Sequence, residues 1–131
     1  MTIEPVATRD APGPAGHYSQ AVVAGGLVFV AGQLPLDPAT GQVVGAADDI
    51  EAQTRQVLRN VEAILRAAGS GLDRLVSVTV FVTSRAHWSG VNRVYADVLG
   101  AHRPARAIVP VPELRPGCLI EVQAIAAVGT E

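Results

Sequence analysis

Hydrophobic residues recur along the chain at two spacings, and each spacing predicts a different kind of element. Across residues 50–68 they fall at every third or fourth position, which is typical of an amphipathic helix. Asp48 or Asp49 can cap the start of this helix, and Gly69-Ser70-Gly71 ends it. Residues 75–83 instead alternate, with valines at the even positions and mostly polar residues between them, so a strand is predicted there.

The other elements complete an α+β order. Glycines at positions 25 and 26 separate two β-rich runs and predict a hairpin turn, and a second apolar stripe predicts a shorter helix. The ranges are 18–23, 27–34, 105–111 and 118–128 for strands and 86–99 for the helix. The order is therefore ββαβαββ, in a single domain over residues 16–131 that follows a flexible tail over residues 1–15.

Some of the strands are apolar on both faces. On the last strand, Ile120 and Val122 belong to one face while Leu119 and Ile125 belong to the other. A strand of this kind is normally covered on both sides, but two helices can cover only one face of such a mixed sheet. We therefore expect the second face to pack against other copies of the chain in a symmetric homo-oligomer. The alternative is that small apolar residues are merely tolerated on an exposed face.

Composition removes several kinds of chemistry. The chain has 131 residues, enough for one domain, and 49% of them are hydrophobic although only 4% are aromatic. All ten basic residues are arginines, so a lysine Schiff base and a P-loop lysine are excluded. The single cysteine permits no disulfide within the chain, and three isolated histidines give no metal-ligand spacing. Neither a metal nor an organic cofactor is expected.

Charge and hydropathy limit the partners. The formal net charge is −2 and the arginines are scattered, so neither nucleic acid nor an anionic membrane is an expected partner. No apolar run is long enough to span a membrane, and the first residues lack the apolar core of a signal peptide. We therefore expect a cytoplasmic protein.

Arg106 and Glu121 stand out because each interrupts an apolar strand. If residues 112–117 form the turn of an antiparallel hairpin, Ile108 faces Glu121 and Arg106 faces Gln123, which puts the two charged residues on one face. An arginine can bind both oxygens of a substrate carboxylate, and a nearby glutamate can hold a water molecule. The alternative interpretation is an ion pair between subunits.

Three further residues give weaker signals. Tyr18 is a candidate for the site or simply an amphipathic residue at the edge of the core. Asn92 within a helix indicates either a tertiary hydrogen bond or a solvent-exposed position. Gly32 within a strand indicates close approach of a backbone or ligand, or a simple bulge.

Several short segments together carry a resemblance that none of them carries alone. They are Tyr18-Ser19-Gln20-Ala21, Val30-Ala31-Gly32-Gln33, Asp37-Pro38-Ala39-Thr40-Gly41, Gln53-Thr54 through Asn60-Val61, Val91-Asn92-Arg93-Val94-Tyr95, Pro104-Ala105-Arg106, and residues 117–126. With these segments the chain resembles the RidA/YjgF family of small enamine and imine deaminases, from about residue 18 to residue 128. The resemblance implies a chorismate-mutase-like fold assembled as a homotrimer, with pockets between subunits and no cofactor.

The resemblance also implies roles for individual residues. Arg106 would hold the carboxylate of 2-aminoacrylate or a related 2-imino acid, Glu121 would position the hydrolytic water, and Tyr18 would close the pocket. The products would be a 2-keto acid and ammonia. The positions implied to bind substrate are Ala31, Gly32, Asn92, Ala107 and Ile108.

The sequence departs from the family pattern inside the implied pocket. Ala31 stands where many members have Ser, Ile108 stands where Thr, Ser or Cys is common, and Val109-Pro110-Val111 replaces the usual Val-Glu-Val. These changes make the pocket more apolar, so a bulkier imine from one particular pathway is an alternative substrate. A second alternative is a binder of small carboxylates, or a holdase, with no turnover. The ribonuclease activity sometimes attached to the family is disfavoured by the acidic charge balance.

Overall fold

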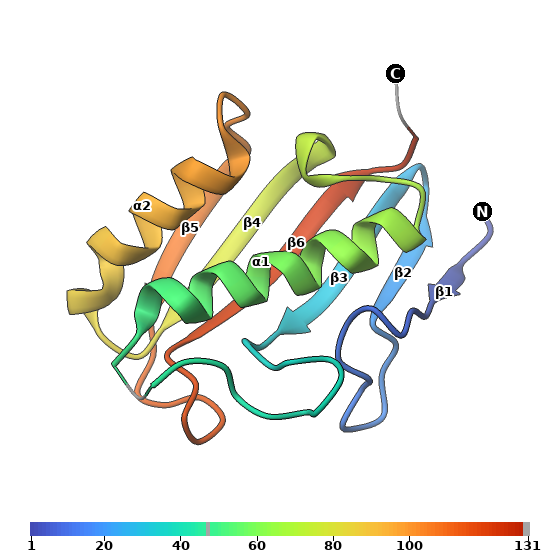
Figure 1. The fold of residues 1–131 in the computed structure, drawn as a ribbon. Coiled ribbons are helices and arrows are strands. Elements are labelled where there is room, and N and C mark those ends of the chain that lie inside the picture. Colours follow the sequence, from blue (N-terminus) through green and yellow to red (C-terminus); the bar gives the residue numbers. More distant parts are fainter. Residues whose placement is uncertain (47, 130–131) are drawn as a thin grey trace.

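The structure is a computed structural model that describes residues 1–46 and 48–129 of the chain. It contains a six-stranded sheet with both α-helices on the same face (Figure 1). The elements are β1 (Glu4–Val6), β2 (Ala21–Ala24), β3 (Leu27–Gln33), α1 (Ile50–Ala67), η1 (Leu72–Arg74), β4 (Leu75–Val82), η2 (Arg85–His87), α2 (Trp88–Leu99), β5 (Ala105–Pro110) and β6 (Ile120–Ala127). The predicted α+β class and both predicted helices are confirmed.

The sheet has the strand order β1-β2-β3-β6-β4-β5. All neighbouring strands are antiparallel except β4 and β5, which run parallel and are connected through α2. The predicted hairpin joins β2 to β3. Its two turn residues, Gly25 and Gly26, have φ values of 59° and 77°, which side chains on those residues would disfavour.

Helix α1 supplies most of the core that faces the sheet. Its N-terminus is capped by Asp49, whose side chain accepts a hydrogen bond from the N–H of Ala52 at 3.0 Å, and Gly69 follows its end with a φ of 77°. The buried positions on the helix keep the spacing that predicted it. They pack with valines of β3, β4 and β6; the largest fully buried members are Val57, Val61, Ile64, Leu65, Val28, Val30, Val78, Val80, Val82 and Ile120.

The prediction of a flexible tail over residues 1–15 is wrong, because this segment is built into the domain. Glu4 to Val6 form β1 and pair antiparallel with β2. Farther along, Ala11 is buried at 3% exposure within the core cluster. The segment contains too short an apolar run for the hydrophobic pattern to mark it as a strand.

The predicted hairpin between the last two strands is also wrong. β5 does not pair with β6; β4 lies between them, parallel to β5 and antiparallel to β6. Arg106 is level with Val78 of β4, and Glu121 is level with Phe81 of the same strand. Side chains alternate between the two faces along a strand, so Val78 and Phe81, three residues apart, point to opposite faces. Arg106 and Glu121, which are level with them, therefore also point to opposite faces of the sheet.

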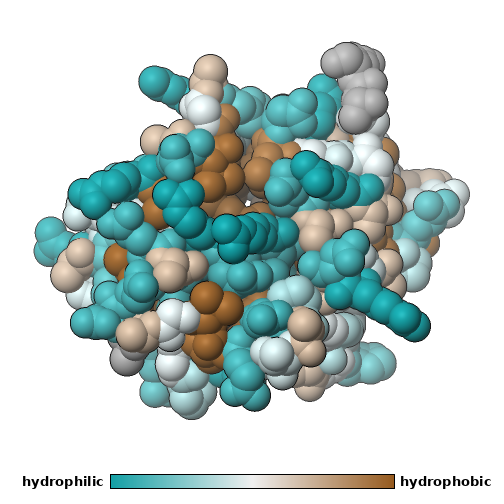
Figure 2. Space-filling view, viewed as in Figure 1, coloured by the Kyte–Doolittle hydropathy of each residue, from teal (hydrophilic) through white to brown (hydrophobic). Residues whose placement is uncertain are grey.

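The two faces of the sheet differ in cover. Figure 2 shows the face that carries α1 and α2, where hydrophilic residues dominate and hydrophobic ones are confined to small patches. The other face, here called the open face, bears no helix and carries both apolar and polar side chains. From the strand register, its side chains include Val22, Phe29, Thr79, Phe81, Ala107, Val109, Gln123 and Ile125.

Exposure on the open face bears on assembly. Phe29 is 42% exposed and Val109 is 37% exposed there. The prediction that strands are apolar on both faces is thus confirmed, while the homo-oligomer inferred from it and the homotrimer implied by the resemblance stay predictions. Among the described residues, no helix combines the length and the apolar character that crossing a membrane requires.

Candidate functional site

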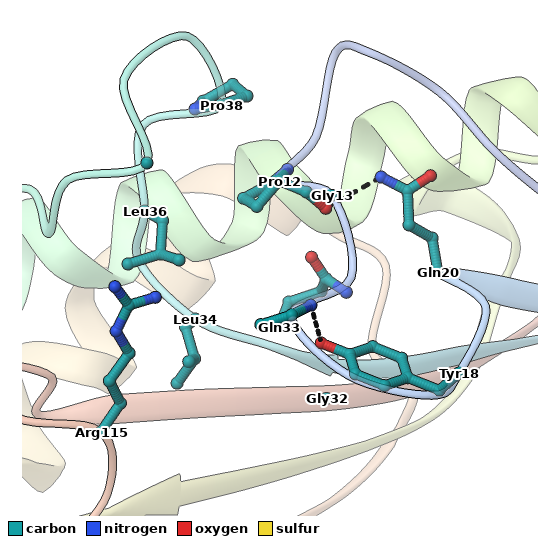
Figure 3. Close-up of a pocket in the computed structure, with 12 residues that line it drawn as sticks. Pro12, Gly13, Tyr18, Gln20, Gly32, Gln33, Leu34, Leu36, Pro38 and Arg115 are labelled. Atoms are coloured by element: carbon teal, nitrogen blue, oxygen red, sulfur yellow. Dashed lines mark hydrogen bonds between the residues drawn. The ribbon is translucent and has the colours of Figure 1, made fainter.

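A cavity of about 290 Å³ opens beside the end of β3, next to the N-terminal segment (Figure 3). Two backbone segments and one arginine form its walls. Apolar side chains line one side of the cavity, and polar groups of Tyr18, Gln20 and Gln33 lie on the other (Figure 3). The lining residues are Pro12, Gly13, Ala15, Tyr18, Gln20, Gly32, Gln33, Leu34, Leu36, Pro38, Gly41 and Arg115.

The buried amide of Gln20 holds the N-terminal wall of this cavity in place. Its oxygen accepts the N–H of Thr8 at 2.7 Å, and its nitrogen donates to the carbonyls of Thr8 at 3.0 Å and Pro12 at 2.9 Å. Gln20 itself is only 3% exposed. A buried amide must find hydrogen-bond partners, and Gln20 finds them in backbone groups of the N-terminal segment. These bonds hold that segment beside the start of β2.

Two buried amides of α1 hold the other walls. Asn60 donates to the carbonyls of Leu34 at 3.0 Å and Leu36 at 2.9 Å, which fixes the segment after β3. Gln53 donates to the carbonyl of Gly117 at 2.8 Å and accepts the N–H of Leu119 at 2.8 Å, which fixes the loop before β6. These two polar residues of α1 thus hold loops around the cavity rather than face solvent.

Glu121 lies over Gly32 on the open face, and Gly32 is one of the residues that line the cavity. β3 carries two residues, Ala31 and Gly32, opposite one residue of β6, so Gly32 is part of a bulge. A Cβ built on Gly32 would clash with Oε2 of Glu121 and would lie 3.1 Å from its Cδ. The interpretation of this glycine as a bulge is confirmed, and the group that approaches it is the side chain of Glu121 rather than a backbone or a ligand.

Burial raises the pKa of the Glu121 carboxyl above its usual range. No arginine lies within ion-pair distance of it in the described parts of the chain, where the ion pairs involve Arg55, Arg66 and Arg93. A carboxylate without a cationic partner is more basic than an ion-paired one. Glu121 is therefore a stronger proton acceptor than an ion-paired carboxylate would be.

Tyr18 stands at the mouth of the cavity. The sequence predicted a strand over residues 18–23, but β2 begins at Ala21, so Tyr18 precedes the strand. Tyr18 is 50% exposed. Its hydroxyl accepts the N–H of Ala15 at 3.3 Å, and its ring lies 3.5 Å from where a Cβ on Gly16 would stand. The tyrosine therefore belongs to the same wall as the N-terminal segment.

Arg106 lies elsewhere, on the edge strand β5 and on the face that carries the helices. Its guanidinium carbon is 4.7 Å from the centre of the Tyr95 ring on α2, a cation–π arrangement. Burial raises the pKa of the Tyr95 hydroxyl, and the charge of Arg106 opposes that shift. Together with Asn92 and His102 these residues line a hollow of about 510 Å³.

These two groups of residues cannot meet within one chain. Going from Glu121 on β6 to Arg106 on β5 means crossing two strand spacings, about 10 Å, and moving about 10 Å along the strands. The two side chains also point to opposite faces. We call the Tyr18, Gly32 and Glu121 group the glutamate half-site, and the Asn92, Tyr95 and Arg106 group the arginine half-site.

The other predicted site residues divide between these places. Ala31 belongs to the bulge beside Glu121, and its N–H donates to the carbonyl of Gln20 at 2.9 Å. Asn92 is exposed in the arginine half-site. Ala107 lies on the open face, whereas Ile108 faces the helices and packs against the core.

Sequence reasoning missed three residues near the half-sites. The sequence placed Tyr95 in the apolar stripe of a helix and in a segment of the family resemblance. It gave no sign that an arginine of the neighbouring edge strand stacks on the ring of Tyr95. Arg115 sits in a loop that the sequence marked only as a turn, and no local pattern signals that it lines a cavity. Cys118 is buried at 4%, and burial raises its thiol pKa, with Arg115 opposing and Glu121 adding to that shift.

Within residues 1–46 and 48–129, no three histidine, cysteine, aspartate or glutamate side chains gather closely enough to hold a metal ion. What the two half-sites offer instead is an arginine fork, a proton-accepting carboxylate and an apolar wall. These groups suit a small polar molecule that carries a carboxylate.

The fold defines the class first: a single-domain α+β protein with a six-stranded mixed sheet and both helices on one face. The model of the family described as Endoribonuclease L-PSP matches residues 8–128. A RutC family protein of Pyrococcus horikoshii is 47% identical over 123 residues, which cover 94% of this chain and 96% of that protein. The chain therefore belongs to the RidA/YjgF family.

Solved structures agree with this membership. YyfA from Yersinia pestis, described as a protein of unknown function of the conserved Rid family, superposes with a TM-score of 0.92 at 41% identity, covering 97% of this chain and 100% of its own. E. coli TdcF, solved with bound serine, gives a TM-score of 0.88 at 35% identity, covering 95% of this chain and 98% of its own. The six-stranded sheet with two helices is thus that of the family.

Proposed function

We propose that this protein hydrolyses reactive enamines and imines, of the kind represented by 2-aminoacrylate and 2-imino acids, to 2-keto acids and ammonia. The observation that carries the proposal is that a chain of the Rid family has both an arginine that makes no ion pair among the described residues and a glutamate whose pKa is raised. Such a substrate is already electrophilic, so it needs orientation and proton transfer rather than a covalent nucleophile.

Each residue has one task in the proposed reaction. The guanidinium of Arg106 binds both oxygens of the substrate carboxylate, and stacking on Tyr95 limits the directions in which it can point. Glu121 accepts a proton from a water molecule, and Tyr18 covers the substrate from the mouth of the cavity. Gly32 has no side chain, and the Glu121 carboxylate occupies the space that one would take.

The bonds balance with water as the only co-reactant. The enamine takes up a proton at its carbon and gives one up from its nitrogen to become the imine. Water then adds across the C=N bond: its hydroxyl bonds to the carbon, and its proton passes through Glu121 to the nitrogen. Glu121 next carries the hydroxyl proton of this adduct to the nitrogen, the C–N bond breaks, and ammonia leaves as the C=O bond forms. Proton transfer by a positioned carboxyl contributes about 10²- to 10⁴-fold to such a step.

We further propose that the complete site forms between two copies of the chain in a homotrimer. Arg106 lies on an edge strand and Glu121 on an inner strand with its side chain on the opposite face, so only a neighbouring copy can bring the two half-sites together. The apolar open face supplies surface for that assembly. An assembly of this kind places each substrate pocket at a subunit interface.

The test supplies 2-imino acids in place with an amino-acid oxidase and follows keto acid release against buffer. We expect acceleration by the protein, and loss of about two orders of magnitude or more of it in Arg106→Ala, because carboxylate orientation is lost. Arg59→Ala, an exposed arginine on α1, is the matched control. No acceleration with any imino acid, short or bulky, would contradict the proposal.

A second candidate, binding of small carboxylates without turnover, is favoured by one observation: E. coli TdcF was solved with bound serine. Calorimetry distinguishes the two functions. Keto acid binding that persists in Glu121→Ala, with no turnover by the unaltered protein, would support the binder. The endoribonuclease name of the family model gains little support here, because the chain carries a net charge of −2.

A further inference from the structure

Arg115 lines the cavity of the glutamate half-site but has no part in the reaction described above. It lies in the loop between β5 and β6, and Figure 3 shows its guanidinium beside Leu36, across the cavity from Tyr18. Leu34 and Leu36 form the apolar wall between these two ends. The cavity therefore has a cationic group at one end and Tyr18 of the glutamate half-site at the other, and Gly32, which Glu121 covers, also lines it.

The base of this arginine is held in place although its side chain is exposed. The amide of Gln53 binds the carbonyl of Gly117 and the N–H of Leu119, both within a few residues of Arg115. No carboxylate of the described residues lies within 4 Å of its guanidinium, since the ion pairs found there involve other arginines. Glu113, two residues earlier, makes no ion pair with it.

An arginine that is held beside an apolar wall, with no acidic partner, has five N–H donors available for a ligand. Every 2-imino acid carries a carboxylate next to the imine carbon, and Arg106 of the arginine half-site is proposed to bind this group. A substrate whose side chain is apolar would leave Arg115 without an anion to bind. A substrate with a second acidic group would give each arginine one carboxylate, with its methylene groups against Leu34 and Leu36.

We propose that Arg115 determines specificity by binding a second acidic group, so that the preferred substrates are imines of dicarboxylic amino acids. This inference rests on the proposed deaminase function, and it adds the chemical class of the side chain. The binding is charge-assisted and partly exposed to solvent, so added salt weakens it.

The test compares two imino acids with five-carbon chains, one from glutamate and one from norvaline, which differ in the terminal carboxylate. We expect the unaltered protein to favour the glutamate-derived imine in kcat/KM by about tenfold, the size of one partly exposed charge-assisted hydrogen bond. Arg115→Gln should abolish this preference and leave turnover of the norvaline-derived imine unchanged. Arg59→Gln, an exposed arginine outside both half-sites, should retain the preference.

Two results would overturn the inference while leaving the deaminase intact: equal kcat/KM for both imines, or an equal loss of both in Arg115→Gln. Absence of turnover with every imine would instead contradict the proposed function. Calorimetry then still tests Arg115. We expect 2-oxoglutarate to bind about tenfold more tightly than 2-oxopentanoate and Arg115→Gln to remove the difference; equal affinities in the unaltered protein would refute the inference.

Discussion

At the scale of single residues, the site depends on what surrounds two groups rather than on unusual side chains. Glu121 is an ordinary glutamate whose pKa is raised because it is buried without a cationic partner. Arg106 is an ordinary arginine whose position is defined by the ring of Tyr95. Both conditions come from residues distant in sequence, so neither can be read from the segments around Arg106 or Glu121.

The raised pKa of Glu121 predicts a stability difference that depends on pH. A carboxyl whose pKa is higher in the folded chain than in the unfolded chain contributes stability below its unfolded pKa and loses it as the pH rises through its folded pKa. Glu121→Gln removes this loss. We therefore expect the variant to be more stable than the unaltered protein at pH 7 and the gain to disappear at about pH 4.

Thermal unfolding at the two pH values measures this difference, with the exposed Glu113→Gln as the control. The same stability gain at both pH values would show that burial of the charged form is not its cause. Activity gives an independent readout, because the amide cannot accept the proton of the water. Turnover by Glu121→Gln should fall by about 10²- to 10⁴-fold.

Gly32→Ala tests the close approach at the bulge. The added methyl group would meet the end of the Glu121 side chain, which can move aside, so we expect the carboxylate to be displaced while the fold survives. Activity should fall by tenfold or more, while the free energy of unfolding changes by less than about 1 kcal/mol. Steady-state kinetics and urea denaturation measure the two effects, and full activity in the variant would rule out a role for this contact.

At the scale of elements, α1 and the strands around it fold as their hydrophobic spacing predicts, and buried amides then connect them to the loops. The spacing located α1, β3, β4 and β6 to within a few residues. The spacing did not reveal that Gln53 and Asn60 would turn inward, because a polar residue on a helix usually faces solvent. These two side chains decide where the cavity walls lie.

The pairing of strands was the part that sequence reasoning could not supply. Six residues, 112–117, separate the two last predicted strands and suit a hairpin turn, yet β5 pairs with β4 through the crossover at α2. Local turn signals cannot distinguish a hairpin from a loop that spans a neighbouring strand. This one choice moved Arg106 from beside Glu121 to the opposite face, which turned a single predicted pocket into two half-sites.

Asn60→Asp tests how strongly α1 holds the segment after β3. The aspartate has the same size but cannot donate to the carbonyls of Leu34 and Leu36, and its charge would be buried. We expect a loss of about 3 kcal/mol in the free energy of unfolding, measured by urea denaturation. Gln42→Glu, the same chemical change at an exposed loop position, should cause almost none. Equal losses in the two variants would show that these hydrogen bonds are not what matters.

At the scale of the whole molecule, the open face and the separated half-sites point to the same requirement for other copies. Phe29 lies on that face at 42% exposure, opposite Ile125 in the strand register. The face that carries the helices is mostly hydrophilic, so it does not offer a comparable surface (Figure 2). A single copy would leave the apolar residues of the open face exposed, and it would keep the two half-sites of the proposed site apart.

Phe29→Asp tests the assembly directly. A charge beside Ile125 on the open face should prevent packing between copies. We therefore expect a monomer by light scattering, and we expect the monomer to lose turnover. Arg59→Asp places the same residue on the outer side of α1 and should leave the assembly intact. A Phe29→Asp protein that keeps both its oligomeric state and its activity would exclude the open face as the interface.

The most direct test of the shared site is complementation between two inactive variants. Arg106→Ala and Glu121→Ala are co-expressed and compared with each variant alone, with the oligomeric state of all three checked by light scattering. If one copy supplies Arg106 and its neighbour supplies Glu121, random mixing restores a native site at about a quarter of the interfaces, and about a quarter of the imine hydrolysis returns. Mixed assemblies that stay as inactive as the separate variants would contradict the account.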